Sequence, residues 1–316
     1  MITTAAASGG NRHGGSPAGR IARGVLTGLV LSFGTLAAPI GAPEGALQRI
    51  DGEYRFTEGP AADALGNVCF TDVRASRIYK WFADTDTVEL YREDTGNANG
   101  LYTAPNGDLI VCQGGRGRVV AIGDRGQVDV VADTYGGSRF NRPNDLWVTP
   151  ADGIYFSDPL YGRGPLRQDG EHVYYVSPER DRVVRVIDDM VRPNGLIGTP
   201  DGLTVYVTDH GAGKTYVYAV EPDGTLSGKT LFAEVGGDGM TLDERGNVYL
   251  AADAVLVFDP SGTRIDRIEV PERPTNLTFA GPDGRILFIT ARSRAYTMPM
   301  AVRGAYPPKA DREPEP

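Results

Sequence analysis

A unit that recurs six times along the chain constrains its fold more than any other sequence feature. Each copy has a glycine turn followed by four to six strand-forming residues. The turn glycines are separated by 41, 46, 49, 44 and 38 residues, and they are Gly66, Gly107, Gly153, Gly202, Gly246 and Gly284. A period in the forties with β-rich content is typical of the four-stranded blades of a β-propeller.

The rest of each unit agrees with this interpretation. A second strand-like run, rich in Val, Ile and Tyr, follows the first, and hairpin signals such as Pro222-Asp223-Gly224 occur between runs. No amphipathic helix pattern of useful length occurs between residues 50 and 300. The sequence therefore predicts an all-β fold over residues 47–303, a six-bladed β-propeller with four-stranded antiparallel blades and a central channel.

The two ends of the chain differ in composition from the propeller. Three arginines between residues 12 and 23 precede the apolar run 24–38, and this order is typical of a secretory signal. We therefore expect residues 1–46 to be a signal peptide or an N-terminal anchor and linker, and the protein to be periplasmic or secreted. If the segment is not functional, the protein would be cytoplasmic. The proline-rich residues 304–316 are expected to be a disordered tail.

Charge and composition exclude several classes of function. The 316-residue chain has a net charge of -9, which disfavours nucleic acid and anionic membranes as partners. Two cysteines and three scattered histidines argue against a disulfide framework and against zinc sites built from thiolates or imidazoles. We expect a small-molecule substrate, with no nucleic-acid partner and no membrane contact beyond the N-terminal anchor. The sequence leaves open whether the protein is a monomer or a dimer.

A polar residue precedes each repeat glycine by eight or nine positions. These residues are Glu58, Asn99, Asn144, Asn194, Asp238 and Asn276. Because the first strand of each blade lines the channel of a propeller, we expect six oxygen-bearing side chains in one ring. A ring of carboxylates and amides suits a hard divalent cation. Any single Asn-Gly pair is more often a turn, but six copies in phase favour metal ligation by at least three of them.

Six motifs at blade spacing carry a resemblance to a known family. They are Phe56-Thr-Glu-Gly-Pro60, Gly96-Asn-Ala-Asn-Gly-Leu101, Arg139-Phe-Asn-Arg-Pro-Asn-Asp145, Phe156-Ser-Asp-Pro-Leu-Tyr-Gly162, Arg192-Pro-Asn-Gly-Leu196 and Gly237-Asp-Gly-Met240. In this order they resemble the senescence marker protein / gluconolactonase / luciferin-regenerating enzyme family, specifically its bacterial gluconolactonase-like branch. The resemblance extends over nearly the whole propeller.

The resemblance implies one divalent cation at the mouth of the channel. Its ligands would be Glu58, Asn194 and Asp238, and Asp238 would also be the general base. We expect Ca²⁺, with Mg²⁺, Mn²⁺ and Zn²⁺ as alternatives. Arg142 is similar to the family's substrate-binding arginine, Asn144 would contribute to the metal or the substrate, and we assign Asn99 to substrate binding as well.

These roles lead to an expected function. The protein would be a metal-dependent hydrolase of lactones, with sugar lactones as the expected substrates, in which metal-activated water attacks the carbonyl. One alternative is different metal-assisted chemistry on a sugar acid or ester, by a lyase, isomerase or esterase. Another is a non-catalytic propeller that binds a ligand, although the carboxylates Glu58 and Asp238 in a ring of amides argue against it.

Three features depart from the family pattern or remain open. Cys112-Gln113-Gly114 stands where many relatives have Cys-Glu-His, which changes one pocket wall and leaves a gluconate-type substrate in question. His210 is either a substrate contact at the channel rim or a solvated loop histidine, and we favour the loop. Asp158 and Tyr161 either line the entrance or pack within their loop.

Overall fold

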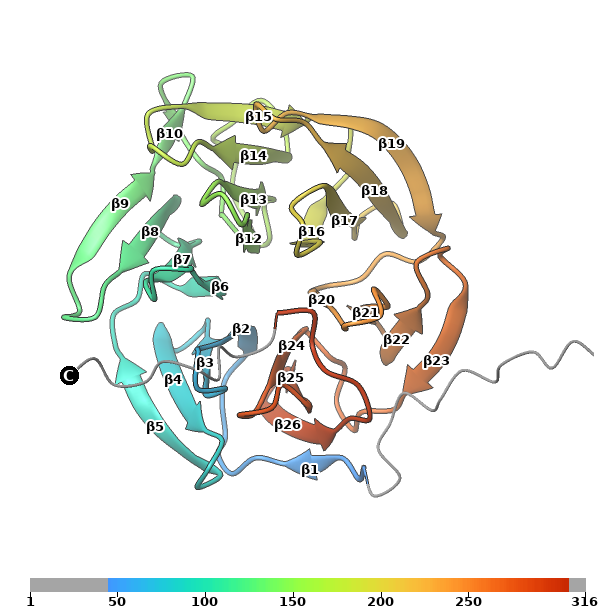
Figure 1. Ribbon diagram of the computed structural model, residues 1–316. Helices are drawn as coiled ribbons and strands as arrows, with labels where there is room; N and C mark the ends of the chain where they lie inside the picture. Colours follow the sequence, from blue (N-terminus) through green and yellow to red (C-terminus); the bar gives the residue numbers. More distant parts are fainter. Residues whose placement is uncertain (1–44, 307–316) are drawn as a thin grey trace, which may run out of the picture. The chain divides into compact units, whose positions relative to one another are not determined.

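The computed structural model describes residues 45–306, and these residues form the predicted six-bladed β-propeller. Six four-stranded antiparallel sheets are arranged around a central channel (Figure 1). Within the described residues every regular element is a strand. In each of the first five blades the strands are consecutive in the chain, and the first strand is the innermost.

The strand bounds follow the repeat closely. Blade 1 contains β2 (Thr57–Ala62), β3 (Val68–Asp72), β4 (Arg77–Phe82) and β5 (Thr87–Arg92), and blade 2 contains β6 (Ala98–Thr103), β7 (Leu109–Gln113), β8 (Arg118–Ile122) and β9 (Val128–Ala132). Blade 3 contains β12 (Leu146–Val148), β13 (Ile154–Asp158), β14 (His172–Val176) and β15 (Val183–Ile187), and blade 4 contains β16 (Pro193–Gly198), β17 (Thr204–Asp209), β18 (Lys214–Val220) and β19 (Leu226–Ala233). Blade 5 contains β20 (Met240–Leu242), β21 (Val248–Ala251), β22 (Val255–Phe258) and β23 (Arg264–Ile268). Blade 6 contains β24 (Asn276–Ala280), β25 (Ile286–Ala291), β26 (Arg294–Pro299) and β1 (Gln48–Arg49). A small hairpin, β10 (Thr134–Tyr135) and β11 (Ser138–Arg139), connects blades 2 and 3.

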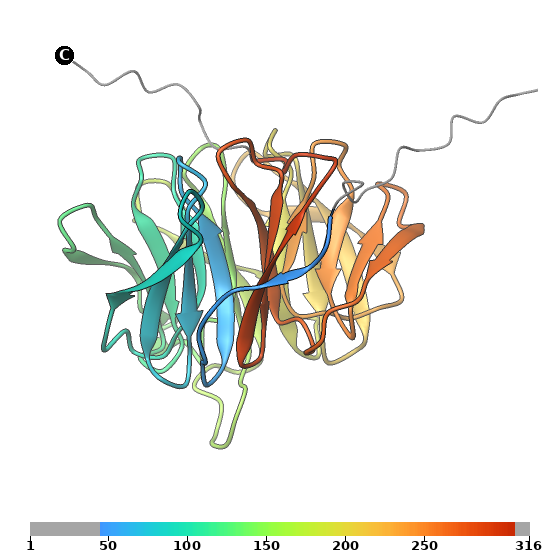
Figure 2. The same ribbon diagram turned by 90° about the horizontal axis from the view of Figure 1, so that it is seen from below.

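The last blade is completed by the N-terminal end of the described chain. Strand β1 pairs antiparallel with β26, with Gln48 opposite Thr297 and Arg49 opposite Tyr296. Figure 2 shows this blue strand crossing beside the red last blade. Because the first described strand lies in the same sheet as the last, the ring is closed by backbone hydrogen bonds rather than by side-chain packing alone.

The core lies between neighbouring blades. Strands β3, β7 and β13 are buried along their whole length, because blades pack against both faces of these sheets. Aromatic rings fill the wider spaces between blades. For example, the rings of Phe70 in blade 1 and Phe288 in blade 6 are 5.5 Å apart, and both side chains are fully buried. This packing makes the inner strands a rigid support for side chains that face the channel.

The ordered chain extends beyond the predicted propeller boundary at residue 303. Gly304 pairs with Asp243 across a β-bridge, and the Tyr306 hydroxyl donates a 2.5 Å hydrogen bond to the carbonyl of Gly198. Residues 304–306 therefore belong to the folded unit and not to a disordered tail. The predicted signal or anchor segment, up to residue 44, and the tail from residue 307 lie outside the described residues. The described part of the chain contains no helix of the length and hydropathy needed to cross a bilayer.

Candidate functional site

The structure brings together all six residues that the sequence assigned to the metal and the substrate. One cavity of about 450 Å³ at a mouth of the channel is lined by Glu58, Asn99, Arg142, Asn144, Asn194 and Asp238. The five ring members come from the beginnings of the innermost strands in blades 1 to 5, or from the residues just before them. The repeat phase therefore placed these side chains correctly in one cavity.

Glycines next to the ring residues allow the inner strands to approach closely. A Cβ atom on Gly59 would lie 2.1 Å from the backbone oxygen of Asn99, and one on Gly195 would lie 2.1 Å from that of Asp238. Both distances are far below any allowed contact, so no other residue fits without a shift of the backbone. The Gly after Glu58 and the Gly after Asn194 therefore let neighbouring blades hold their polar side chains close together.

A repeated aspartate holds the chain just ahead of three ring residues. Asp158, the last residue of β13, accepts hydrogen bonds from the backbone amides of Asn141 (2.8 Å) and Arg142 (2.7 Å). Asp72 and Asp209 occupy the same place in blades 1 and 4, where they accept bonds from Arg55 and Phe56 and from Val191 and Arg192. These buried carboxylates fix the approach to Glu58, Asn144 and Asn194.

The aspartate clamps were missed by sequence reasoning, although a signal for them was present. Three of the six repeat strands end in Thr-Asp or Ser-Asp, at Asp72, Asp158 and Asp209. The clamp also decides between the two interpretations of Asp158. Its side chain is completely buried and bonds to the backbone, so Asp158 supports the site and does not line its entrance.

The two carboxylates of the site are buried and repel each other. Burial raises the pKa of Glu58 well above its ordinary value, and the charges of Asp238 and Asp145 raise this pKa further. Burial also raises the pKa of Asp238 to about 6, although His210, Asn194 and Arg273 act in the opposite direction. A pair of buried carboxylates is costly unless a cation neutralises it. This arrangement is therefore suited to a positively charged ligand.

The neighbouring amides can complete a set of oxygen ligands. The Nδ2 of Asn194 donates to Asp238 Oδ1 (2.6 Å) and to the hydroxyl of Tyr161 (2.8 Å). Rotation of this amide would turn its oxygen toward the carboxylates, where a cation would favour it. The Oδ1 of Asn99 is buried and has no hydrogen-bond partner among the described residues. Such an orphaned oxygen beside two carboxylates fits a hard cation.

The kinds of side chain that line the cavity also indicate which cations would fit it. In residues 45–306 no group of three or more His, Cys, Asp or Glu side chains is arranged to hold a metal ion. The oxygen-bearing side chains that line this cavity are the carboxylates Glu58 and Asp238 and the amides beside them, such as Asn99 and Asn194. Ca²⁺ accepts six to eight oxygen ligands with flexible geometry, some of them from water, so it fits this set better than ions that prefer nitrogen or sulfur.

Cationic side chains line the same cavity. Arg142 donates from Nη1 to the backbone oxygen of Tyr161 (2.8 Å), which holds its guanidinium at the cavity wall. Arg74 also lines the cavity, and its guanidinium lies 5.1 Å from the centre of the Phe56 ring. Sequence reasoning did not identify Arg74. It lies in the loop after a second strand, as Tyr161 does, and that shared place in the repeat was the available signal.

Two further residues near the entrance now have defined surroundings. Tyr161 lines the cavity, and its hydroxyl accepts the bond from Asn194, which supports the entrance interpretation for this residue. His210 is partly buried, hydrogen-bonds through Nδ1 to the oxygen of Gly237 (3.2 Å), and faces the Tyr161 ring. His210 therefore lies in the loop after β17 as expected, and its partly exposed ring packs beside the segment that carries Asp238.

Asn276 does not occupy the ring position that the repeat predicted. The carbonyl of Thr275 accepts a hydrogen bond from Gly239 of the preceding blade (2.8 Å), as the carbonyl of Asp238 does from Gly195 (3.0 Å). Thr275 is therefore the sixth ring residue, and Asn276 is the next residue along the inner strand, farther into the channel. Thr275 lies nine residues before its turn glycine, Gly284, whereas Asp238 lies eight residues before Gly246, so residue counts to the turn are not equivalent between blades.

Asn276 instead forms part of a bar across the channel. Its Nδ2 donates to Asp145 Oδ2 (3.2 Å), from the opposite blade 3. Each of the two side chains also accepts a hydrogen bond from the backbone amide of the following leucine, Leu146 or Leu277. Burial raises the pKa of Asp145 to about 7. We refer to Asp145 and Asn276 as the crossbar, and each lies one residue farther along its inner strand than a ring residue.

The departure at residues 112–114 opens one wall of the cavity. Gly114 lines the cavity, and a Cβ at this position would lie 3.3 Å from the backbone oxygen of Pro143. Gln113 is buried and accepts a 2.6 Å bond from Arg118 Nε, so its side chain is directed away from the site. The lack of a side chain at Gly114 therefore leaves space beside Arg142 in this wall.

Comparison with known proteins agrees with this architecture. Residues 56–293 match the family model described as the SMP-30/Gluconolactonase/LRE-like region. A gluconolactonase from Zymomonas mobilis is 28% identical over 281 residues, covering 78% of each chain. The lactonase drp35 from Staphylococcus aureus is 27% identical over 234 residues, covering 68% of this chain and 70% of its own.

Solved structures give the same result. A gluconolactonase from Xanthomonas campestris is 27% identical with a TM-score of 0.77, covering 83% of this chain and 91% of its own. Regucalcin from Agrobacterium tumefaciens, described as a calcium-binding protein, shares the fold at 19% identity and a TM-score of 0.71, covering 85% of this chain and 98% of its own. Because the family model matches most of the propeller and the site motifs meet in one cavity, the chain belongs to the SMP-30/gluconolactonase/LRE-like family.

Proposed function

We propose that this protein hydrolyses lactones, with sugar lactones as its substrates, at the cavity formed by the inner strands of blades 1 to 5. The observation that carries the proposal is the meeting of two buried carboxylates, four amides and two arginines in one cavity of about 450 Å³. The relatives named as a gluconolactonase and a lactonase support the choice of lactones over other esters.

A divalent cation would be held by Glu58, Asn194 and Asp238, and we propose Ca²⁺ for the reasons of ligand type given above. When bound, such an ion supplies Lewis-acid polarisation of a carbonyl and lowers the pKa of nearby water. The protein contributes the geometry, because the clamps Asp72 and Asp209 hold the chain ahead of Glu58 and Asn194.

Asp238 is proposed as the general base. With its pKa raised to about 6 by burial, the carboxylate is ionised at neutral pH and still basic enough to accept a proton. It would take a proton from the water that adds to the lactone carbonyl, and would return it to the ring oxygen when the carbon–oxygen bond breaks. The Tyr161 hydroxyl and the Asn194 amide hold the surroundings of this carboxylate in place.

Arg142, Asn144 and Asn99 are proposed to bind the substrate. The Arg142 guanidinium is fixed through Tyr161, and its remaining N–H groups are available for a sugar hydroxyl or for the developing oxyanion. The Asn99 oxygen that lacks a partner would accept a hydrogen bond from a substrate hydroxyl if it does not bind the cation. We further propose that the protein is exported, on the basis of the sequence of residues 1–46.

A panel of substrates tests this proposal. The protein would be treated with a chelator, restored with Ca²⁺, Mg²⁺, Mn²⁺ or Zn²⁺, and assayed on sugar lactones, simple aliphatic lactones, open-chain esters and sugar acids. We expect metal-dependent acid release from sugar lactones in a pH-indicator assay. Turnover of open-chain esters or sugar acids alone would support the alternative chemistries, and no turnover of any substrate with any metal would leave only a ligand-binding propeller.

A further inference from the structure

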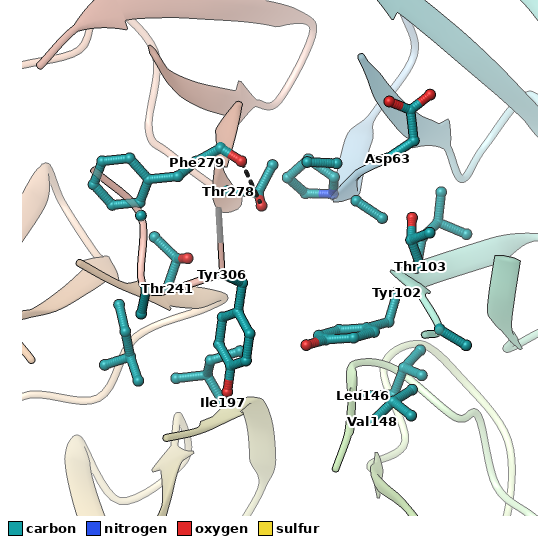
Figure 3. A pocket seen from close by; sticks show the side chains of 18 of the residues that line it. Asp63, Tyr102, Thr103, Leu146, Val148, Ile197, Thr241, Thr278, Phe279 and Tyr306 are labelled. Atoms are coloured by element: carbon teal, nitrogen blue, oxygen red, sulfur yellow. Dashed lines mark hydrogen bonds between the residues drawn. The ribbon is translucent and has the colours of Figure 1, made fainter. Parts of the chain in front are cut away.

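A second cavity lies at the other mouth of the same channel. The inner strands begin at the candidate site, and residues two to five positions farther along them line a cavity of about 650 Å³. Figure 3 shows its side chains directed toward a common central space from several blades. The crossbar residues Asp145 and Asn276 line its inner end. The two cavities therefore occupy the two mouths of one channel and have the crossbar between them.

The chemistry of this second cavity differs from that of the first. Its wall is largely aliphatic and aromatic, and representative residues are Leu101, Leu146, Ile197, Leu242 and Phe279. Among the described residues that line it there is no Lys, Arg or His. The acidic ones are Asp145 in the crossbar and Asp63 at the rim, which pairs with Lys80 at 2.8 Å. Anions are therefore disfavoured electrostatically, and apolar neutral molecules are favoured.

The C-terminal end of the described chain builds one wall of the cavity. The Tyr306 hydroxyl accepts a hydrogen bond from Trp147 Nε1 (3.1 Å) and donates one to the carbonyl of Gly198. The amide of Ala305 bonds to the carbonyl of Leu242 (2.9 Å), which fastens this segment to blade 5. The Tyr306 ring is therefore held in place by blades 3, 4 and 5, and the cavity has a preformed shape.

The hydroxyl of Tyr102 in the wall lacks a hydrogen-bond partner among the described residues. The Tyr102 ring packs edge-on to the Tyr306 ring at 6.3 Å, and its hydroxyl is directed toward the centre of the cavity (Figure 3). No side chain or backbone atom of the described residues forms a hydrogen bond with this hydroxyl. By contrast, Asp145 and Asn276 are bonded to each other and to backbone amides. The Tyr102 hydroxyl therefore remains available to a ligand in this apolar cavity, as do the smaller hydroxyls of Thr103 and Thr241.

We propose that this second mouth is a binding site for a small, neutral, largely hydrocarbon molecule with one hydroxyl or carbonyl group. The apolar body would pack against the leucine and aromatic wall, and the polar group would hydrogen-bond to the Tyr102 hydroxyl. The volume lies within the range of about 300–1,000 Å³ that is usual for pockets binding molecules of drug size. The site is separate from the proposed lactone site and does not depend on that activity.

Binding of a neutral fluorescent dye tests the proposal. The full-length protein is titrated with N-phenyl-1-naphthylamine, whose emission rises in apolar surroundings, and 1-decanol and decanoate at pH 8 are added as competitors. We expect saturable 1:1 binding that 1-decanol displaces and that decanoate displaces at least tenfold less effectively. The dye should bind equally to Asp238→Asn, because that change lies in the other cavity. Absence of saturable binding would overturn the proposal, and so would loss of binding in Asp238→Asn.

Substitutions within the cavity locate the site. Thr278→Trp and Thr103→Trp, from blades 6 and 2, would each fill the cavity from a half-buried position and should weaken dye binding at least tenfold. Thr230→Trp on the exposed strand β19 is the matched control and should bind normally. Tyr102→Phe should weaken 1-decanol about 2- to 10-fold through loss of one hydrogen bond. Thermal unfolding identifies a variant that fails to fold, and normal binding by both folded tryptophan variants would contradict the assignment.

Discussion

The Asp238→Asn substitution should stabilise the protein when no metal is present. The carboxylate of Asp238 is fully buried, and its ionised form is disfavoured by that burial. Asparagine has nearly the same shape and can still accept the 2.6 Å hydrogen bond from Asn194 through its own oxygen. The substitution therefore removes a buried negative charge beside Glu58 without creating a cavity.

The size of the effect follows from the pKa of Asp238. Its rise from 3.8 to about 6 is a shift of about 2 units, which corresponds to about 3 kcal/mol at 1.4 kcal/mol per unit. Because the folded pKa is the higher one, the folded state binds the proton more tightly, and its stability falls as pH rises between these values. The cost is complete above pH 6 and disappears as pH falls toward the unfolded pKa. The substitution should therefore gain about 3 kcal/mol at pH 8 and about half of that at pH 5.

Urea unfolding in excess chelator measures this difference. The wild type, Asp238→Asn and an exposed control, Asp124→Asn, would be compared at pH 8 and pH 5, and the control should differ from the wild type by less than about 0.5 kcal/mol. In saturating Ca²⁺ the order should reverse, because the wild type alone gains full binding energy. If Asp238→Asn were less stable than the wild type at pH 8 in chelator, the electrostatic account of the site would be refuted.

Three further substitutions test other parts of the account. Arg142→Ala should lower kcat/KM for a sugar lactone about 10- to 100-fold, mainly through KM, because it removes a charged hydrogen-bond donor. The control Arg125→Ala, on the exposed surface, should leave initial-rate kinetics unchanged. An unchanged KM for Arg142→Ala would show that Arg142 does not bind the substrate. Asn276→Leu removes the side-chain hydrogen bond that the crossbar carboxylate Asp145 accepts, and it should reduce the free energy of unfolding in urea by about 1–3 kcal/mol. An unchanged free energy of unfolding would mean that the crossbar does not contribute to stability. Asp209→Ala leaves three backbone amides without an acceptor, so the free energy of unfolding in urea should fall by about 2–4 kcal/mol. Calorimetry should also show weaker Ca²⁺ binding. Wild-type values in both measurements would refute the role of Asp209 in holding the chain ahead of Asn194.

The fold could be predicted from the sequence because the repeat is long-range and redundant. Each of the six glycine turns begins a strand pair, so an error in one unit would not have changed the number of blades. The closing strand β1 was not predicted, since two residues, Gln48 and Arg49, carry no periodicity. The order of Tyr306 was missed for a different reason. Its anchoring depends on Trp147 and Gly198, which are far away in the chain.

The candidate site was predicted in part, and the successes and failures have separable causes. Glu58, Asn99, Asn144, Asn194 and Asp238 were found because phase in a repeat translates directly into position around a ring. The level of each residue along the channel axis is set instead by hydrogen bonds between the inner strands of neighbouring blades. Residue counting does not capture these features, and the ring position was therefore assigned to Asn276 instead of to Thr275, the residue before it.

Arg74 shows a second reason why a repeat alone does not predict the whole site. Most of the predicted site residues lie ahead of a first strand. The loops after the second strands also reach the cavity, and there the sequence drew attention only to Gly114, Tyr161 and His210. Arg74 and Tyr161 belong to such loops, and they come from different blades. Their convergence depends on how blades 1 and 3 are arranged around the channel, which a single repeat unit does not contain.

The central claim is that a cation held by Glu58, Asn194 and Asp238 is required for lactone hydrolysis. The most direct measurement is the initial rate of sugar-lactone hydrolysis as a function of free Ca²⁺, compared with calorimetric Ca²⁺ binding in the wild type and in Glu58→Gln. The account predicts that the rate saturates at the Kd found by calorimetry, and that Glu58→Gln raises both values by the same factor. A rate that is unchanged in excess chelator, or wild-type Ca²⁺ binding by Glu58→Gln, would contradict it.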